Sequence, residues 1–414
     1  MRPIGLFYFI TMKSFNSGRP KKYFYQSHYK SAGFSGLGRR RPMGRPVQKI
    51  DPARFINKAI QDEGVENYTP QHEFQDFKID QQLIAAVAAK GYKIPTPIQD
   101  QVIPQIVDGL DVVGIADTGT GKTAAFLLPL INKVFINPEE QILIVAPTRE
   151  LAIQIDQEFK SFVRGMGMFS VSCVGGMGIG RQISELRYRY SFIIGTPGRL
   201  KDLIQRKMIN LSQFNTVVLD EADRMFDMGF INDTRFIING MPKSRQTLFF
   251  SATISNEIER MIREFTKNPV RVSVKTRDTS KNVEQDIIKV GEGRTKLDVL
   301  NNLLSQKEFN KVLIFGRTKY GVEKLSRILL REGFSVESIH GDKNNSQRQK
   351  ALSMFKDNRV QVLVATDVAA RGLDIADISH VINYDMPSTY DDYIHRIGRT
   401  GRYNKRGMAL TFVD

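Results

Sequence analysis

From about residue 74, short apolar segments alternate with amphipathic segments in two successive series. The expected strands are 112–115, 141–146, 169–174, 192–195, 216–220 and 246–250 in the first series, and 285–290, 311–315, 336–339, 360–365, 380–384 and 408–413 in the second. Apolar strands separated by helices are typical of parallel sheets covered by helices on both faces. The alternation therefore predicts two tandem α/β domains, each a doubly wound parallel sheet.

A polar, mixed-charge stretch separates the two series and is interpreted as a linker, residues 273–284. The predicted organisation is an amino-terminal extension (1–73), a first domain (74–272), the linker (273–284) and a second domain (285–414). A chain of 414 residues is long enough for two cores, and its apolar fraction of 41% is that of ordinary globular proteins. The single cysteine, Cys173, excludes an intramolecular disulfide and a cysteine-clustered zinc site. We expect it to pack as a small apolar residue in a strand.

The extension carries most of the positive charge. Residues 1–50 contain eleven Lys and Arg and no Asp or Glu, in a protein whose formal net charge is +16. Aromatic residues are interleaved with glycine and arginine, as in 31–46. We expect this segment to be largely disordered, because its composition cannot bury a core. It can neutralise phosphates and stack on unpaired bases, or it can be a solubilising basic tail without a specific partner.

The first ten residues contain only a brief apolar run, followed by no small-residue cleavage site and no long apolar span. This pattern argues against a secretory signal and a membrane helix. We expect a cytoplasmic, monomeric protein. The acid-free, Arg- and Ser-bearing start also resembles an organellar transit peptide, which is the alternative.

Residues 116–123, ADTGTGKT, lie between an expected strand and an expected helix. Glycines in such a loop let backbone N–H groups turn towards phosphate oxygens, while the lysine reaches the β and γ phosphates and the threonine can hold Mg²⁺. Ala116 stands where the strict motif has its first glycine, and a glycine-rich turn that only joins strand and helix is the alternative. The candidate nucleotide-binding residues here are Thr118, Gly119, Thr120, Gly121, Lys122 and Thr123.

The acidic string DEAD, residues 220–223, follows another apolar segment. Its position places Asp220 and Glu221 at the carboxyl edge of the predicted sheet, where ligands bind in such folds. A solvated turn is the alternative, which the preceding apolar strand argues against. Together with the glycine-rich loop, the string indicates a site for a nucleoside triphosphate and Mg²⁺, with Asp220 as a metal candidate alongside Thr123.

The second series has no Gly-Lys-Thr triplet after its corresponding strand and is not expected to bind its own nucleotide. It carries instead HRIGRTGR at 395–402, in which Arg396, Arg399 and Arg402 recur every three residues. Such spacing would cluster them along one side of a turn or short helix. A solvated basic face is the alternative. We favour arginines supplied across a cleft to stabilise transition-state charge.

These strings, in this order, resemble the DEAD-box family of ATP-dependent RNA helicases, in its bacterial type, over about residues 74–414. The resemblance implies two RecA-like domains that bind ATP, Mg²⁺ and RNA. Residues 91–99, GYKIPTPIQ, are similar to the family's adenine-reading motif. The resemblance implies that Gln99 hydrogen-bonds the adenine edge and that Phe74 stacks near the ring. As isolated residues they would more often be a helix-start glutamine and a core phenylalanine.

The resemblance also implies an RNA-binding set. Its members are Pro147, Thr148, Arg149, Gly175, Gly176, Thr196, Pro197, Gly198 and Arg199 in the first domain, and Arg317, Arg348 and Thr366 in the second. Ser251 and Thr253, with His395 and Arg396, match elements that couple hydrolysis to strand separation. Arg371 and Asp374 are nucleotide-side candidates. The string FGRT at 315–318 departs from the usual family pattern and makes the contact of Arg317 less secure.

The implied activity is RNA-stimulated ATP hydrolysis with local opening of short RNA duplexes or remodelling of RNA–protein complexes. The residues expected to carry catalysis are Lys122, Asp220, Glu221, Arg399 and Arg402. An ATP-gated RNA clamp would use the same motifs and stays open as an alternative. A DNA translocase is a third interpretation, which the DEAD and GYKIPTPIQ strings oppose.

Overall fold

The computed structural model describes residues 55–56, 68–117, 119–274, 283–370, 375, 377–401 and 407–413. The chain divides into Met1–Gln48 and Lys49–Asp414, and every described residue belongs to the second of these units. The basic segment 1–50 lies outside the described residues. The same holds for four of the predicted site residues, namely Thr118, Arg371, Asp374 and Arg402.

The first series of strands forms a parallel seven-stranded sheet in the order β3-β4-β2-β5-β6-β1-β7. Its strands are β1 (Val112–Ile115), β2 (Gln141–Val145), β3 (Ser170–Cys173), β4 (Phe192–Gly195), β5 (Phe214–Leu219), β6 (Gln246–Ser251) and β7 (Val270–Ser273). Six of them fall within two residues of their predicted bounds. The predicted doubly wound parallel sheet is therefore confirmed for this half.

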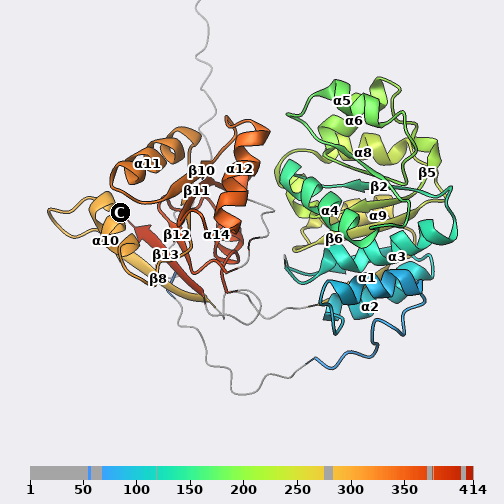
Figure 1. Ribbon diagram of the computed structural model, residues 1–414, viewed down its shortest axis with the longest axis horizontal. Helices are drawn as coiled ribbons and strands as arrows, with labels where there is room; N and C mark the ends of the chain where they lie inside the picture. Colours follow the sequence, from blue (N-terminus) through green and yellow to red (C-terminus); the bar gives the residue numbers. More distant parts are fainter. Residues whose placement is uncertain are drawn as a thin grey trace, which may run out of the picture. The chain divides into compact units, whose positions relative to one another are not determined.

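Helices cover both faces of this sheet (Figure 1). They are α1 (Gln81–Ala89), α2 (Pro97–Val107), α3 (Lys122–Ile136), α4 (Arg149–Phe162), α5 (Ile179–Glu185), α6 (Pro197–Gln205), α7 (Ala222–Asp227), α8 (Ile231–Asn239) and α9 (Asn256–Phe265). The core on one face is built with α1 to α4, and the core on the other with α6 to α9.

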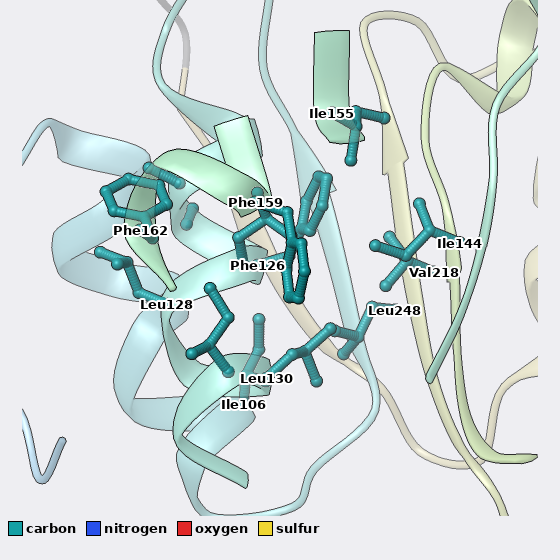
Figure 2. Close-up of a cluster of buried hydrophobic side chains, with 14 of the residues drawn as sticks. Ile106, Phe126, Leu128, Leu130, Ile144, Ile155, Phe159, Phe162, Val218 and Leu248 are labelled. Carbon is teal, nitrogen blue, oxygen red and sulfur yellow. The ribbon is translucent and has the colours of Figure 1, made fainter. Parts of the chain in front are cut away.

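Successive side chains along a strand belong alternately to the cores on the two faces of the sheet. On β2, Ile142 and Ile144 belong to the core under α1 to α4, whereas Leu143 and Val145 belong to the opposite core. Figure 2 shows aromatic and aliphatic side chains of the helices converging on Ile144 and on its neighbours from β5 and β6. A strand buried on both faces must be apolar at every position, which is why these segments read as continuous apolar runs.

The second series forms a parallel six-stranded sheet in the order β10-β11-β9-β12-β13-β8. Its strands are β8 (Val283–Lys289), β9 (Val312–Gly316), β10 (Val336–Ile339), β11 (Val362–Thr366), β12 (His380–Asn383) and β13 (Gly407–Val413). Its helices are α10 (Lys296–Leu304), α11 (Lys319–Arg331), α12 (Asn345–Lys356), α13 (Asp367–Ala370) and α14 (Tyr390–Ile397). Helices α10 and α11 pack on one face, and α12 to α14 on the other.

The strands next to the expected linker extend into it. Strand β7 pairs with β1 through Val270 to Ser273 and was not predicted, although Val270, Val272 and Val274 alternate directly before the sequence turns polar. Strand β8 begins at Val283, two residues before the predicted start of the second domain. An alternation this short is decided by pairing with a neighbouring strand, which β1 provides for β7.

Phe55, within the predicted extension, is fully buried in the core of the second half. The centroid of its ring lies 4.5 Å from the centroid of the Tyr393 ring on α14. No periodicity surrounds Phe55 in the sequence that would have indicated this contact. Cys173, in contrast, is buried in β3 as expected, and burial raises the pKa of its thiol to about 12. Among the described residues, no helix is long and apolar enough to cross a membrane.

Candidate functional site

Strand order sorts the predicted motifs of the first half into two groups. Strands β5, β6 and β1 are neighbours, and their carboxyl ends lead into 220–223, 252–253 and 116–123. Strands β3, β4 and β2 are also neighbours, and they lead into 175–176, 196–199 and 147–149. Because all seven strands are parallel, both groups lie along one edge of the sheet. The nucleotide candidates are thus gathered at one part of the edge and the RNA candidates at the other.

The glycine-rich loop is held in the shape that an anion site requires. Gly119 and Gly121 have φ values of 84° and 93°, a left-handed conformation in which a side chain would be strained. Lys122 begins α3, is buried, and its Nζ donates to the carbonyl oxygen of Ala116 at 2.5 Å. The loop therefore curls around its own lysine at the amino terminus of a long helix, where backbone N–H groups and the helix dipole favour phosphate.

Gln99 connects the adenine-reading motif with this loop. Its Oε1 accepts a hydrogen bond from the Thr96 N–H at 2.9 Å, and its Nε2 donates to the Gly121 carbonyl oxygen at 3.1 Å. A Cβ at Gly121 would lie 2.5 Å from that Nε2, so only glycine fits there. Phe74 packs edge-on against Phe77 and Tyr92 in the core. In this conformation Phe74 is thus a core residue that contacts the adenine-reading motif through Tyr92.

Asp100, beside Gln99, binds the segment that precedes the first domain through hydrogen bonds. The sequence pattern did not predict these contacts. The buried carboxylate accepts hydrogen bonds from the Tyr68 hydroxyl, from the Gln71 N–H at 2.9 Å and from the His72 N–H at 3.1 Å. His72 Nδ1 also lies 2.7 Å from Asp100 Oδ1. Burial alone would raise the pKa of Asp100, but these donors hold it below its usual value. The ordered chain thus begins before the predicted boundary at residue 74.

The carboxylates of the DEAD string differ in electrostatic environment. Burial raises the pKa of Asp220 to about 7; the charge of Lys122 opposes that rise, and the charge of Glu221 adds to it. The pKa of Asp223 is lowered, although burial acts to raise it, because Lys122 and Arg224 lie nearby and Thr253 donates to it. Asp220 is therefore a buried acid with too little positive charge around it. A buried carboxylate in such surroundings is suited to binding a cation.

Asp223 links the DEAD string to the segment after β6. Its Oδ2 accepts three hydrogen bonds, from the Ala252 N–H at 3.1 Å, the Thr253 N–H at 2.9 Å and the Thr253 hydroxyl at 3.1 Å. Ser251 in turn donates its hydroxyl to the Thr253 carbonyl oxygen at 2.8 Å. Of the predicted coupling residues, Thr253 therefore contacts the acidic string directly, and Ser251 contacts Thr253. Asp223 was not among the predicted site residues, although the DEAD string contains it.

The donor set fits Mg²⁺ in chemical type. Asp220 and Thr123 offer hard oxygen ligands on neighbouring parts of the sheet edge, and Lys122 alone leaves Asp220 undercompensated. Within the described ranges, no group of three His, Cys, Asp or Glu side chains is placed to hold a metal ion by itself. Mg²⁺ commonly uses one or two carboxylates together with water and substrate phosphates. The arrangement therefore suits an ion delivered with a nucleotide.

Two of the predicted arginines have different environments. Arg399 lines a cleft together with Asp117, Glu221, Asp223 and His395, and its Nε donates to the His395 carbonyl oxygen at 3.2 Å. The structure thus brings Arg399 and His395 to the acidic string.

Arg396 points elsewhere. It is buried, makes hydrogen bonds of 2.5 and 2.8 Å to the two carboxylate oxygens of Asp367, and lies over the Phe315 ring at 5.1 Å. It therefore ties α14 to its own sheet, and it does not share one face with Arg399 as the three-residue spacing had suggested.

Most of the predicted RNA-binding residues line a single groove. From the first half these are Pro147, Thr148, Arg149, Gly175, Thr196, Gly198 and Arg199, and from the second half Arg348. Gly176 does not line the groove itself but has a φ of 73°, and a Cβ there would lie 2.0 Å from Arg149 Nη1. The glycine thus lets the Arg149 guanidinium approach the backbone closely. Three helices, α4, α6 and α12, begin at or near the groove.

Several members of this set already have protein partners. Arg199 Nη1 donates to Gln182 Oε1 at 2.8 Å and to the Met177 carbonyl oxygen at 3.2 Å. Arg348 Nη2 lies 2.8 Å from Glu150 Oε1. Arg317 and Thr366, at the ends of β9 and β11, do not line the groove, and the Arg317 N–H donates to Asp385 at 2.7 Å.

Comparison with known proteins agrees with this site. Family models described as "DEAD/DEAH box helicase" and "Helicase conserved C-terminal domain" match residues 96–261 and 295–404. These two domains define the class of protein, a two-domain helicase.

The chain is 46% identical over 344 residues to the DEAD-box ATP-dependent RNA helicase CshA of Bacillus subtilis, a match that covers 82% of this chain and 69% of the relative. Among solved structures, S. cerevisiae Dbp5 bound to RNA and ADP BeF3 is 30% identical with a TM-score of 0.72, over 82% of this chain and 89% of that chain. Mss116p bound to ssRNA and AMP-PNP is 29% identical with a TM-score of 0.73, over 81% and 72%. The chain belongs to the DEAD-box family of ATP-dependent RNA helicases.

Proposed function

We propose that this chain couples hydrolysis of Mg²⁺-bound ATP to RNA binding and to local opening of short RNA duplexes. The observation that carries the proposal is the placement of Lys122 after β1 and of the buried carboxylates of Asp220 and Glu221 after β5, the two parallel strands that flank β6. RNA binding is supported by the groove at the other part of the same sheet edge. One sheet edge thus offers both substrates adjacent sites.

In the proposed reaction, the loop at 116–123 binds the triphosphate through its backbone N–H groups, and Lys122 contacts the β and γ phosphates. Asp220 and Thr123 would hold Mg²⁺, which when bound neutralises charge on the β and γ phosphate oxygens. Glu221 orients the attacking water and accepts its proton. The water oxygen bonds to the γ phosphorus while the bond to ADP breaks, giving ADP and inorganic phosphate.

Charge that develops on the transferred group calls for further positive charge in addition to Lys122. Arg399 is at hand, since it lines the same cleft as Glu221 and Asp223. Arg402, outside the described residues, is proposed for the same role. Arginines that stabilise transferring phosphoryl groups contribute about 10³ to 10⁵ in rate in related systems. We therefore expect Arg402→Ala to bind ATP and to lose turnover.

RNA is proposed to bind through its phosphates and sugars. Helix amino termini and arginines line the groove, and these groups suit sugar–phosphate contacts that carry no sequence information. Selection of RNA over DNA would come from the 2′-hydroxyl groups. The basic segment 1–50 is proposed to add sequence-independent affinity, so its deletion should weaken RNA binding and flatten its salt dependence. A deletion that leaves the salt slope unchanged would favour the solubilising tail.

The test is an ATPase assay with RNA, with DNA and with neither, run beside unwinding of a short RNA duplex. We expect stimulation by RNA, loss of turnover in Glu221→Gln, and loss of turnover in wild type when Mg²⁺ is chelated. Equal stimulation by DNA would contradict the proposal. Turnover without duplex opening, together with long-lived RNA binding, would instead identify an ATP-gated clamp. A cytoplasmic location stays a prediction, which cell fractionation would check.

A further inference from the structure

Glu221 has a backbone conformation that only a few described non-glycine residues adopt. Its φ and ψ are 51° and 52°, in the left-handed region, and it lies at the junction between β5 and α7. A left-handed non-glycine residue is strained and persists only where surrounding contacts hold it. Here its N–H donates to Asp220 Oδ1 at 3.0 Å. The chain therefore holds the Glu221 side chain at the end of the strand at a cost in backbone energy.

The guanidinium of Arg224, one helical turn further on, contacts the Glu221 carboxylate. Its Nη1 donates to Glu221 Oε2 at 2.8 Å, and the two side chains are only 3% and 6% exposed. The Arg224 N–H also donates to the Glu221 carbonyl oxygen at 3.0 Å and to Asp223 Oδ1 at 3.0 Å. A charge-assisted hydrogen bond in so dry a place is strong and directional. It fixes one carboxylate oxygen of Glu221 and leaves Oε1 for another partner.

We propose that Arg224 is a positioning residue for hydrolysis, which holds the buried Glu221 carboxylate in one orientation through the hydrogen bond to Oε2. The proposal rests on the proposed function, in which Glu221 accepts the proton of the attacking water. Without that hydrogen bond the Glu221 side chain can adopt other rotamers, and the attacking water loses its fixed acceptor. Arg224 acts through Glu221 and contacts no substrate in the proposed reaction.

Other charged groups surround Glu221 and do not replace Arg224. Asp220 and Asp223 belong to the same string, Lys122 begins α3 beyond β1, and Asp117, His395 and Arg399 line the same cleft. Lys122 Nζ donates to the Ala116 carbonyl oxygen, and Arg399 Nε donates to the His395 carbonyl oxygen, whereas Arg224 Nη1 donates directly to the Glu221 carboxylate.

The experiment compares Arg224→Met, which removes the charge at similar length, with Arg224→Lys, which keeps it. The control is Arg235→Met, which removes an exposed ion pair to Glu264 in the same half. RNA-stimulated turnover is measured at saturating ATP, and ATP affinity is measured separately with a fluorescent ATP analogue. For Arg224→Met we expect turnover to fall about 10- to 100-fold, as when partners that orient a reactive group are removed. The affinity for ATP should change less than about threefold.

Turnover should return towards the wild-type value in Arg224→Lys, which keeps a cation that can donate to Glu221. Wild-type turnover in Arg224→Met would overturn the proposal, as would a parallel loss of ATP affinity, which would indicate a purely structural role. If Arg224→Met does not fold, Arg224→Lys decides. Turnover equal to that of Arg235→Met would then overturn the proposal.

Failure of the proposed function gives a different result. Glu221→Gln should abolish turnover, and adding Arg224→Met to Glu221→Gln should then change nothing further. Retained turnover in Glu221→Gln would remove Glu221 from its role as proton acceptor. Loss in Glu221→Gln together with wild-type kinetics in Arg224→Met would overturn only the role of Arg224.

Discussion

The Asp223 carboxylate accepts hydrogen bonds from both the N–H and the hydroxyl of Thr253, at 2.9 and 3.1 Å. One oxygen of the acidic string is thereby bound to the segment that follows the next strand of the sheet. A shift of either segment must move the other or break these bonds. The pair is thus a physical connection between the catalytic string and the chain beyond β6.

Replacing Thr253 with valine should weaken coupling and leave ATP binding nearly intact. The valine removes the hydroxyl donor, while the N–H groups of Ala252 and Thr253 still bind Asp223. We expect a stability loss of about 1 kcal/mol. The unwinding rate should fall more than the ATPase rate, measured side by side on the same RNA duplex. Thr247→Val is the matched control, because the buried Thr247 hydroxyl has no hydrogen-bond partner among the described residues. Equal losses in both assays would contradict the prediction.

Neutralising Asp220 should stabilise the protein as it destroys activity. The folded-state pKa of about 7 lies above the ordinary carboxyl value, so the native state binds more protons than the unfolded state between about pH 4 and 7. The cost of ionising Asp220 therefore appears as pH rises through this window and stays constant above it. Asp220→Asn should raise the melting temperature more at pH 8 than at pH 5, by an amount equivalent to about 1–4 kcal/mol.

Asp223→Asn should change the stability of the fold in the opposite direction to Asp220→Asn. The pKa of Asp223 is lowered, so its ionised form stabilises the fold above its unfolded pKa, and that contribution is lost as pH falls through the folded value. An asparagine must also turn an NH₂ group towards backbone N–H donors. We expect Asp223→Asn to lower stability at pH 8 by about 1–3 kcal/mol. Melting curves for both variants with the same pH dependence would refute this assignment of the two carboxylates.

Phe55→Ala should destabilise the second half. The Phe55 ring is fully buried against Tyr393, and truncation of such a side chain costs about 3–5 kcal/mol. Ile56→Ala is the matched control, because Ile56 is 52% exposed and its truncation should cost less than about 0.5 kcal/mol. Thermal unfolding and limited proteolysis would measure both. If the two variants are equally stable, Phe55 contributes nothing to that core.

Much of the fold could be predicted from the sequence, because the strands are buried on both faces and therefore apolar at nearly every position. Strand β7 could not, since its structure depends on pairing with β1. Phe55 could not either, because a single aromatic residue far from its partner in sequence carries no periodic signal. Tertiary contacts decide both cases.

The site was predictable where a motif fixes backbone shape, as in the loop at Gly119 and Gly121. Partners of charged side chains were not predictable. The three-residue spacing of Arg396 and Arg399 suggested a shared face, but the carboxylate of Asp367 binds Arg396 and turns it into the core. Likewise, the sequence around Asp100 does not indicate that Tyr68 and His72 donate hydrogen bonds to it. Spacing indicates which residues can meet, and competing partners determine which do.

The ion pair between Glu150 and Arg348 should oppose RNA binding. Arg348 Nη2 lies 2.8 Å from Glu150 Oε1, yet that oxygen and Arg348 Nε are buried without a hydrogen-bond partner among the described residues. Burial lowers the pKa of Arg348, and Glu150 opposes this shift. A pair whose hydrogen bonds are incomplete holds its arginine weakly, and both residues line the groove proposed for RNA. An RNA phosphate would compete with Glu150 for the same guanidinium.

We therefore expect Glu150→Gln to tighten RNA binding roughly 3- to 10-fold and to steepen its salt dependence by about one released counterion, since Arg348 is then free to bind phosphate. Arg348→Met should weaken binding and reduce the slope by a similar amount. Arg327→Met, which breaks an exposed pair with Glu323 on α11, is the control and should change neither quantity. Fluorescence anisotropy with a labelled single-stranded RNA over a series of salt concentrations measures both. Weaker RNA binding by Glu150→Gln would show that the pair supports the groove and does not compete with RNA.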